Sequence, residues 1–213
     1  MASVKICGLS TAETVAAAAD GGAAFLGFNF YPRSPRAVTP EAAARLAEPV
    51  RGRGIKLVAI VVDPDDALID AIAAHLKPDL VQFHGHETPA RVREASARAG
   101  VGAIKAIAIS EAADFDAAPA FEPVVEHLLF DARPPKDAAL PGGVGARFEW
   151  SLLAGRRYAR PHFLAGGLDP WNLQEAIAAS GAPLVDVSSG VERGPGLKDP
   201  ALIAAFLDAA KRA

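Results

Sequence analysis

The chain has 213 residues, of which 51% are hydrophobic, 22% charged and 7% aromatic, and its formal net charge is −3. This length suits one sizeable domain or two small ones, and the composition excludes a disordered or fibrous chain. The weak negative charge argues against nucleic acid or an anionic membrane as a partner, and the single cysteine excludes an internal disulfide and zinc sites built on two cysteines.

The first residues, MASVKICGLS, lack the long apolar stretch of a secretory signal and resemble a strand instead. The most apolar run, residues 56–62 (KLVAIVV), is far too short to span a bilayer. Together with the low cysteine count, these features predict a cytoplasmic protein with a small-molecule partner.

Short runs rich in Val, Ile, Leu and Phe recur along the chain, each followed by turn residues and then by an Ala-rich segment of helical character. The runs cover residues 4–8, 24–30, 56–62, 80–85, 103–109, 127–132, 162–168 and 184–190. Most are continuously apolar, which is typical of parallel strands that are covered on both faces.

Helix starts support this division of the chain. Residues 10–13 (STAE) match a capping box, in which a hydroxyl and a carboxylate satisfy the first backbone N–H groups of a helix. Elsewhere a side-chain acceptor precedes a proline that suits the first helical position. These pairs begin at Thr39, Asp63, Thr88, Asp169 and Asp199.

Eight βα units without a linker predict a single (βα)8 barrel over residues 1–213, with eight parallel strands surrounded by helices. An open doubly wound sheet is the alternative. However, no G-x-G-x-x-G follows the first run, and the chain has no P-loop sequence. Residues 110–127 hold two prolines in a poor helical pattern, so we expect helix five to be short or irregular.

The carboxyl ends of the strands form the catalytic face of such a barrel, and reactive side chains stand at two of them. Asp131 ends the apolar run HLLFD, where partial burial would suit it to act as a general acid; a structural pairing with Arg133 is the alternative. Cys7 ends the first run, where a nearby helix N-terminus or cation would favour a thiolate that acts as base or nucleophile. The alternative for Cys7 is a small buried hydrophobe.

Glycine and serine end the last two strands and leave backbone N–H groups open to an anion. These residues are Gly166, Gly167, Ser189 and Gly190, and they predict a phosphate site; tight strand-to-helix turns are the alternative. A third Gly-rich loop, residues 141–147, lies near the same rim and would form a lid or an ordinary loop.

The loop YPRSPRAV, residues 31–38, holds Arg36 on a stiff frame of prolines, where its guanidinium could clamp a substrate carboxylate or lie in solvent. His84 and His86 form the only close histidine pair. Neighbouring strand ends supply few partner ligands for them, so we predict no metal site.

These rim motifs resemble the phosphoribosylanthranilate isomerase family of tryptophan biosynthesis across nearly the whole chain. The matching segments, in that family's order, are KICGLS, GFNFYPRSPRAV, VQFHGHE, IKAI, LLFDA, GGVGARFEW, LAGGLDPWN and VDVSSGVERGPGLKD. Any one of them could arise by chance, whereas all of them together are highly specific.

The resemblance implies a barrel that catalyses an Amadori rearrangement of an aminoaldose phosphate without metal or cofactor. It implies Cys7 as the general base, Asp131 as the general acid and Arg36 as the partner of the anthranilate carboxylate. His84 and Asp186 would face the sugar, and Gly166, Gly167, Ser189 and Gly190 would hold the phosphate. The partner is then a phosphorylated small molecule, and we expect a monomer.

Some residues differ from those that are usual in the motifs of the family. Ser10 stands where a threonine is common, Val144 where a threonine is frequent, and Phe83 and His86 where leucine and aspartate are more familiar. Two other functions remain open at this point. One is the related isomerase of histidine biosynthesis, which performs the same rearrangement on a bisphosphorylated substrate, and the other is a phosphate-ligand-binding barrel without chemistry.

Overall fold

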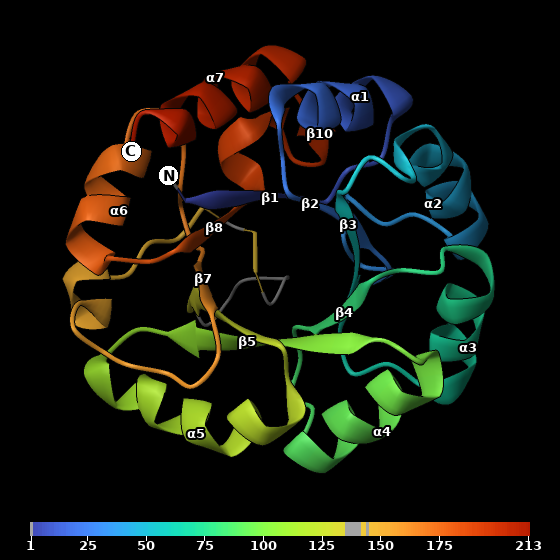
Figure 1. The fold of residues 1–213 in the computed structure, drawn as a ribbon, viewed down its shortest axis with the longest axis horizontal. Coiled ribbons are helices and arrows are strands. Elements are labelled where there is room, and N and C mark those ends of the chain that lie inside the picture. The colour runs from blue at the N-terminus through green and yellow to red at the C-terminus, as the bar shows by residue number, and fades with distance from the viewer. Residues whose placement is uncertain (1, 135–141, 144) are drawn as a thin grey trace.

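The computed structural model describes residues 2–134, 142–143 and 145–213. In this part of the chain eight parallel strands, β1 to β8, form a closed barrel in sequence order, and β8 pairs with β1. Figure 1 looks down the barrel and shows the helices as an outer ring. The predicted (βα)8 barrel is therefore confirmed. The open sheet is excluded because each of the strands β1 to β8 pairs with a strand on both sides, which leaves no edge strand among them.

The barrel strands are β1 (Ser3–Cys7), β2 (Phe25–Asn29), β3 (Lys56–Val61), β4 (Leu80–Phe83), β5 (Gly102–Ile109), β6 (His127–Ala132), β7 (His162–Leu164) and β8 (Leu184–Val187). The α-helices are α1 (Ala12–Gly21), α2 (Pro40–Ala47), α3 (Asp66–His75), α4 (Pro89–Ala99), α5 (Ala118–Phe121), α6 (Leu173–Ser180) and α7 (Pro200–Lys211). An antiparallel hairpin of β9 (Glu192–Gly194) and β10 (Leu197–Lys198) lies between β8 and α7.

Helix five is short, as predicted. The helix α5 spans only Ala118–Phe121 and lies between two 3-10 segments, η2 (Ala112–Ala117) and η3 (Glu122–Val124). Prolines stand at the starts of both α5 and η3, where no backbone N–H is needed. In the described residues β6 and β7 are joined through a further 3-10 segment, η4 (Trp150–Leu153), in place of an α-helix.

Three of the predicted helix caps are confirmed: Thr39, Thr88 and Asp199 each accept a hydrogen bond from the first turn of the following helix. The predicted capping box at Ser10 is wrong. Thr11 caps α1 instead, and its hydroxyl accepts from the backbone N–H of Thr14. The helix thus starts one residue later than the sequence pattern indicates.

Two aspartate–proline pairs were expected to cap helices and do not. The side chain of Asp65, rather than Asp63, caps α3, and α6 begins after Asn172 rather than at Asp169. Both aspartates instead bind loop backbone: Asp63 Oδ1 accepts from the N–H of His86 at 2.7 Å, and Asp169 Oδ1 accepts from that of Asn172 at 2.9 Å. Their carboxylates therefore fix loops at the rim.

Alternation along each strand separates two cores. Outward side chains pack against the helices, while inward ones fill the barrel with a smaller apolar cluster. That inner cluster comprises Phe25, Val58, Leu80, Ile104, Ala106, Leu129, Phe163 and Ala165. The inner residues become polar toward the carboxyl ends of the strands, as Cys7, Asn29, Asp131 and Asp186 show. The packed core thus forms the floor of a polar pocket.

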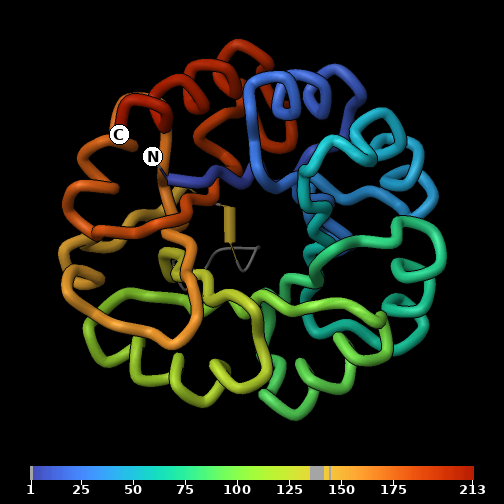
Figure 2. The backbone as a smooth tube through the Cα atoms, viewed as in Figure 1, coloured from blue at the N-terminus to red at the C-terminus, as the bar shows by residue number. Residues whose placement is uncertain are grey.

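The first strand and the last helix lie side by side, and Figure 2 shows the two chain ends on the same side of the barrel. Within the described ranges, no helix combines the length and the apolar character needed to cross a membrane.

Candidate active site

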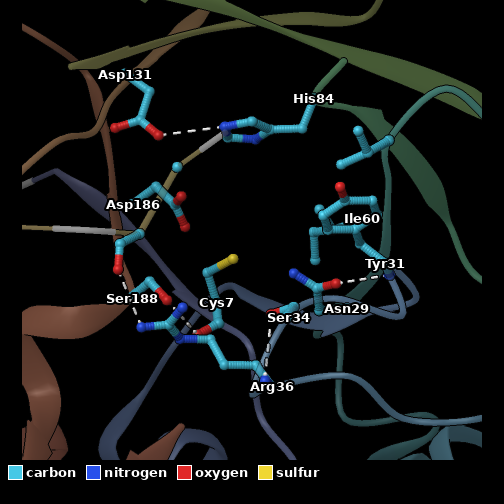
Figure 3. A pocket seen from close by; sticks show the side chains of 13 residues that line it. Cys7, Asn29, Tyr31, Ser34, Arg36, Ile60, His84, Asp131, Asp186 and Ser188 are labelled. Carbon is cyan, nitrogen blue, oxygen red and sulfur yellow. Dashed lines mark hydrogen bonds and ion pairs between the residues drawn. The ribbon is translucent and has the colours of Figure 1, made fainter. Parts of the chain in front are cut away.

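A pocket at the carboxyl ends of the strands brings together five of the predicted site residues. Cys7, Arg36, His84, Asp131 and Asp186 all line it, although they come from widely separated parts of the chain. Figure 3 shows the sulfur of Cys7 pointing into the pocket, with His84 and Asp131 on the side opposite to it. A ligand in this space would lie between the thiol and the carboxylate.

Asp131 is buried at the end of β6, with 9% of its surface exposed. Its Oδ2 lies 3.3 Å from Nε2 of His84, and Nδ1 of that ring lies 3.0 Å from the amide nitrogen of Gln82. In the assigned orientation of the Gln82 amide its nitrogen donates to Nδ1, and the proton of a neutral ring then stands on Nε2, which faces Asp131. The alternative considered for Asp131, a structural pairing with Arg133, does not occur, because Arg133 pairs with Asp114 instead.

Cys7 is 8% exposed, and its environment differs from the expected one. Burial raises the pKa of the Cys7 thiol, while the positive charges of Lys5, Lys198 and Arg36 oppose this effect and Asp186 adds to it. Cations therefore act on the thiol, as the sequence predicted. The free thiol is therefore the resting form near neutral pH, and ionisation requires a further favourable interaction.

Asp186 and Lys5 form an ion pair inside the barrel, with Oδ1 and Nζ 2.8 Å apart. The side chain of Lys5 has no exposed surface, and Lys5 is aligned with Asp186 in the β1–β8 register. Sequence reasoning overlooked Lys5. Its signal was available, because Lys5 stands two residues before Cys7 and alternation places both side chains inside the barrel.

Arg36 is 4% exposed and already holds a carboxylate of its own chain. Its Nε donates to Glu192 Oε1 at 2.7 Å, one terminal nitrogen donates to Oε2 at 2.8 Å, and the same nitrogen reaches the carbonyl of Gly143 at 3.1 Å. Lys198 also contacts Glu192. Glu192 and Lys198 were missed in the sequence, since nothing in their spacing connects the hairpin β9–β10 with a loop after β2.

A second pocket adjoins the first and shares Asp131 and Asp186 with it. Gly166, Gly167 and Ser189 line this second pocket, as the phosphate prediction requires, and both glycines have the positive φ angles, +88° and +64°, that favour this residue.

Gly190 stands apart from the other predicted phosphate residues. It does not line the second pocket, and a Cβ on Gly190 would lie 1.8 Å from the carbonyl oxygen of Leu168. The structure thus uses Gly190 for a close approach of two loops.

The remaining predictions concern metals and the loop after β6. His86 is almost completely exposed, and its nearest carboxylate, Asp63, lies 3.6 Å away. In residues 2–134, 142–143 and 145–213, no three His, Cys, Asp or Glu side chains gather as metal ligands would. Val144 and residues 135–141 lie outside the described residues.

Comparisons with known proteins agree with this arrangement. The family model described as N-(5′-phosphoribosyl)anthranilate isomerase matches residues 4–209. The N-(5′-phosphoribosyl)anthranilate isomerase of Caulobacter vibrioides is 71% identical over 209 residues, which cover 98% of this chain and 95% of the relative. The chain belongs to the N-(5′-phosphoribosyl)anthranilate isomerase family. It is therefore an enzyme, an isomerase of tryptophan biosynthesis, as its motifs indicated.

Solved structures of phosphoribosylanthranilate isomerases share the fold over the full length. One was determined in complex with reduced 1-(o-carboxyphenylamino)-1-deoxyribulose 5-phosphate; it has a TM-score of 0.84, 32% identity, and coverage of 100% of both chains. Another is that of monomers generated from the dimeric enzyme of Thermotoga maritima, with a TM-score of 0.85, 32% identity and coverage of 100% of both chains.

Proposed function

We propose that the chain catalyses the Amadori rearrangement of N-(5′-phosphoribosyl)anthranilate to 1-(2-carboxyphenylamino)-1-deoxyribulose 5-phosphate. The observation that carries the proposal is the placement of Cys7 and Asp131 on opposite sides of one pocket at the barrel rim. The reduced product analogue bound to a related structure has the same two charged ends, a carboxylate and a phosphate. No observation favours the histidine-pathway substrate or a barrel without chemistry.

The two ends of the substrate match the two adjoining pockets. Arg36 lies in the pocket with Cys7, where its guanidinium would meet the anthranilate carboxylate. Backbone N–H groups around Gly166, Gly167 and Ser189 would hold the phosphate in the second pocket. Gly190 would shape that pocket from behind. Fixing both ends positions the sugar between the acid and the base.

The chemistry begins at Asp131. In its protonated form Asp131 gives a proton to the ribose ring oxygen, the bond between this oxygen and C1′ breaks, and a protonated Schiff base forms. The positive nitrogen acidifies the hydrogen on C2′, which the thiolate of Cys7 removes. The resulting enolamine gains a proton at C1′ and loses one from its C2′ hydroxyl, which gives the ketone.

The protons balance over the cycle. Asp131 has lost one proton and Cys7 has gained one, so transfer of a proton from the thiol to the carboxylate through solvent restores the reactive form, with a thiolate and a carboxylic acid. This form is reached by ionisation of the resting free thiol. His84, in contact with Asp131, and Asp186, beside the thiol, would face the hydroxyl groups of the sugar. Metal and cofactor have no part in these steps.

The test follows the loss of substrate fluorescence during turnover of freshly generated substrate. We expect Asp131→Asn and Cys7→Ala each to lower kcat by about 10²–10⁴-fold, which is the usual contribution of acid–base catalysis. Asp208→Asn is the matched control, because Asp208 contacts Lys211 on the surface of α7. Full turnover by either pocket variant would contradict the role assigned to that residue.

We also propose that the chain acts in the cytoplasm as a single-domain monomer. Analytical ultracentrifugation tests the oligomeric state, and a stable dimer at micromolar concentration would contradict it.

A further inference from the structure

Three buried charged side chains meet beside the catalytic pocket. The carboxylate of Glu192 lies between the guanidinium of Arg36 and the ammonium of Lys198. Their side chains are 3%, 5% and 1% exposed, respectively. Groups this buried interact strongly because water screens them little. The cluster therefore sets the local charge of the pocket wall that Arg36 forms.

The hairpin β9–β10 holds this cluster against the loop that carries Arg36. At its turn Gly196 has a φ of +78°, donates its N–H to Glu192 Oε2 at 3.2 Å, and approaches Pro35 so closely that a Cβ would lie 2.6 Å from the carbonyl oxygen. Lys198 Nζ also donates to the carbonyl oxygen of Ser188 at 3.2 Å. The hairpin thus connects the Arg36 loop with the end of β8.

The cluster has two cations, Arg36 and Lys198, and one anion, Glu192, so one positive charge is not neutralised within it. Glu192 uses Nε and one terminal nitrogen of Arg36, which fixes the plane of the guanidinium in a bidentate pair. That pair alone is neutral, and a neutral pair would attract a substrate carboxylate weakly. Lys198 adds a second cation, so two positive groups share one carboxylate and the cluster keeps a net charge of about +1.

Two pKa directions agree with this arrangement. Burial opposes the charge of Glu192, but hydrogen bonds from Arg36 and the charge of Lys198 outweigh it and lower the pKa of Glu192. Burial lowers the pKa of Lys198, and the charge of Glu192 only partly offsets this effect. Glu192 therefore stays ionised, whereas Lys198 loses its proton at a lower pH than an ordinary lysine does.

We infer that Glu192 and Lys198 are specificity-determining positioning residues: Glu192 orients Arg36, and Lys198 keeps the subsite positive for a ligand carboxylate. This inference rests on the proposed function, which places that carboxylate at Arg36. It predicts that Lys198 contributes to discrimination between carboxylated and uncarboxylated ligands more than to binding of the sugar phosphate.

The experiment compares two ligands by calorimetry: the reduced product analogue and the same compound without the ring carboxylate. The Kd of the compound without the carboxylate, divided by the Kd of the reduced product analogue, measures carboxylate recognition. We expect Lys198→Met to reduce this ratio by about tenfold or more and Lys198→Arg to preserve most of it, since a buried charge pair contributes strongly to recognition. If Lys198 had a purely structural role, Lys198→Met would weaken the binding of both ligands by the same factor. An unchanged ratio in Lys198→Met therefore overturns the inference.

A second measurement needs no change at Lys198. In a Cys7→Ala background, which removes the thiol whose charge also acts on Lys198, the ratio should fall as pH rises toward 10, because Lys198 loses its charge at a lower pH than an ordinary lysine while Glu192 stays ionised. A ratio that stays constant over this range contradicts the inference, including in the case where Lys198→Met does not fold.

Arg36→Met separates this inference from the function on which it rests. A loss of discrimination in Arg36→Met with none in Lys198→Met overturns only the role of Lys198. Unchanged discrimination in Arg36→Met overturns the carboxylate assignment in the proposed function, and with it the present inference.

Discussion

Replacing Lys5 with methionine tests the electrostatic design of the barrel interior. Lys5 has no exposed surface, and its Nζ lies 2.8 Å from Oδ1 of Asp186, which is itself 7% exposed. Methionine has nearly the same length and flexibility but carries no charge. Lys5→Met therefore leaves the carboxylate of Asp186 buried without its cation and removes the largest influence that lowers the pKa of Cys7.

The cost in stability follows from the burial of both charges. Removing one partner of a buried ion pair costs about 3–5 kcal/mol, because the remaining charge keeps its desolvation penalty and loses its compensation. In a domain of about 150–250 residues, about 1 kcal/mol moves Tm by about 2–4 °C. We therefore expect Lys5→Met to lower Tm by about 6–20 °C.

Urea unfolding of a double-mutant cycle checks this reasoning. The double variant Lys5→Met/Asp186→Asn removes both charges and should recover at least half of the stability lost in Lys5→Met. Strictly additive losses would show that the two groups do not interact. If Lys5→Met lowers the free energy of unfolding by less than about 1 kcal/mol, the pair stabilises the protein no more than an exposed surface ion pair does. This result would refute the expectation that burial makes the pair costly to break.

Three further predictions concern the thiol, a buried histidine and the phosphate pocket. Because burial raises the pKa of Cys7, the rate of its alkylation by iodoacetamide should still be rising above pH 9; a plateau below pH 7 would show a preformed thiolate. Burial lowers the pKa of His162, so the unfolded chain takes up a proton first and the free energy of unfolding falls from pH 7 to 5. His162→Phe should lessen this fall, whereas His86→Gln should not, because His86 is exposed. Identical pH profiles of stability for the two variants would contradict this role of His162. Gly190→Ala should cost about 1–3 kcal/mol and weaken binding of the product analogue, because its Cβ would overlap a carbonyl oxygen 1.8 Å away; Gly194→Ala, with 3.9 Å of clearance, is the control, and equal effects would refute the packing argument.

Periodicity was sufficient to predict the barrel and the placement of its reactive strand ends. The apolar runs alternate with helical segments, and in a closed parallel barrel all strand ends meet at one rim. Cys7 and Asp131 could thus be predicted to share a site although 123 residues lie between them. Helix starts were harder, because an Asp before a proline can cap a helix or bind loop backbone, and Asp63 and Asp169 do the latter.

The partners of the predicted site residues could not be predicted from spacing. The pairing of Arg36 with Glu192 joins a loop after β2 to a hairpin after β8, and only the closure of the barrel brings them together. The pKa of Cys7 also depends on the folded structure, since burial and four charged neighbours from separate parts of the chain act on the thiol at once. Residue type and position indicate a candidate base, whereas its ionisation depends on packing.

A crystal structure of this chain with the reduced product analogue would show whether Cys7 and Asp131 act on opposite sides of one bound sugar. We expect Sγ of Cys7 in contact with the carbon that loses its proton and Asp131 on the other side of the sugar. The ring carboxylate should lie on Arg36, and the phosphate at Gly166 and Gly167. A sugar out of reach of Sγ, or one with both side chains on the same side, would contradict the roles of Cys7 and Asp131.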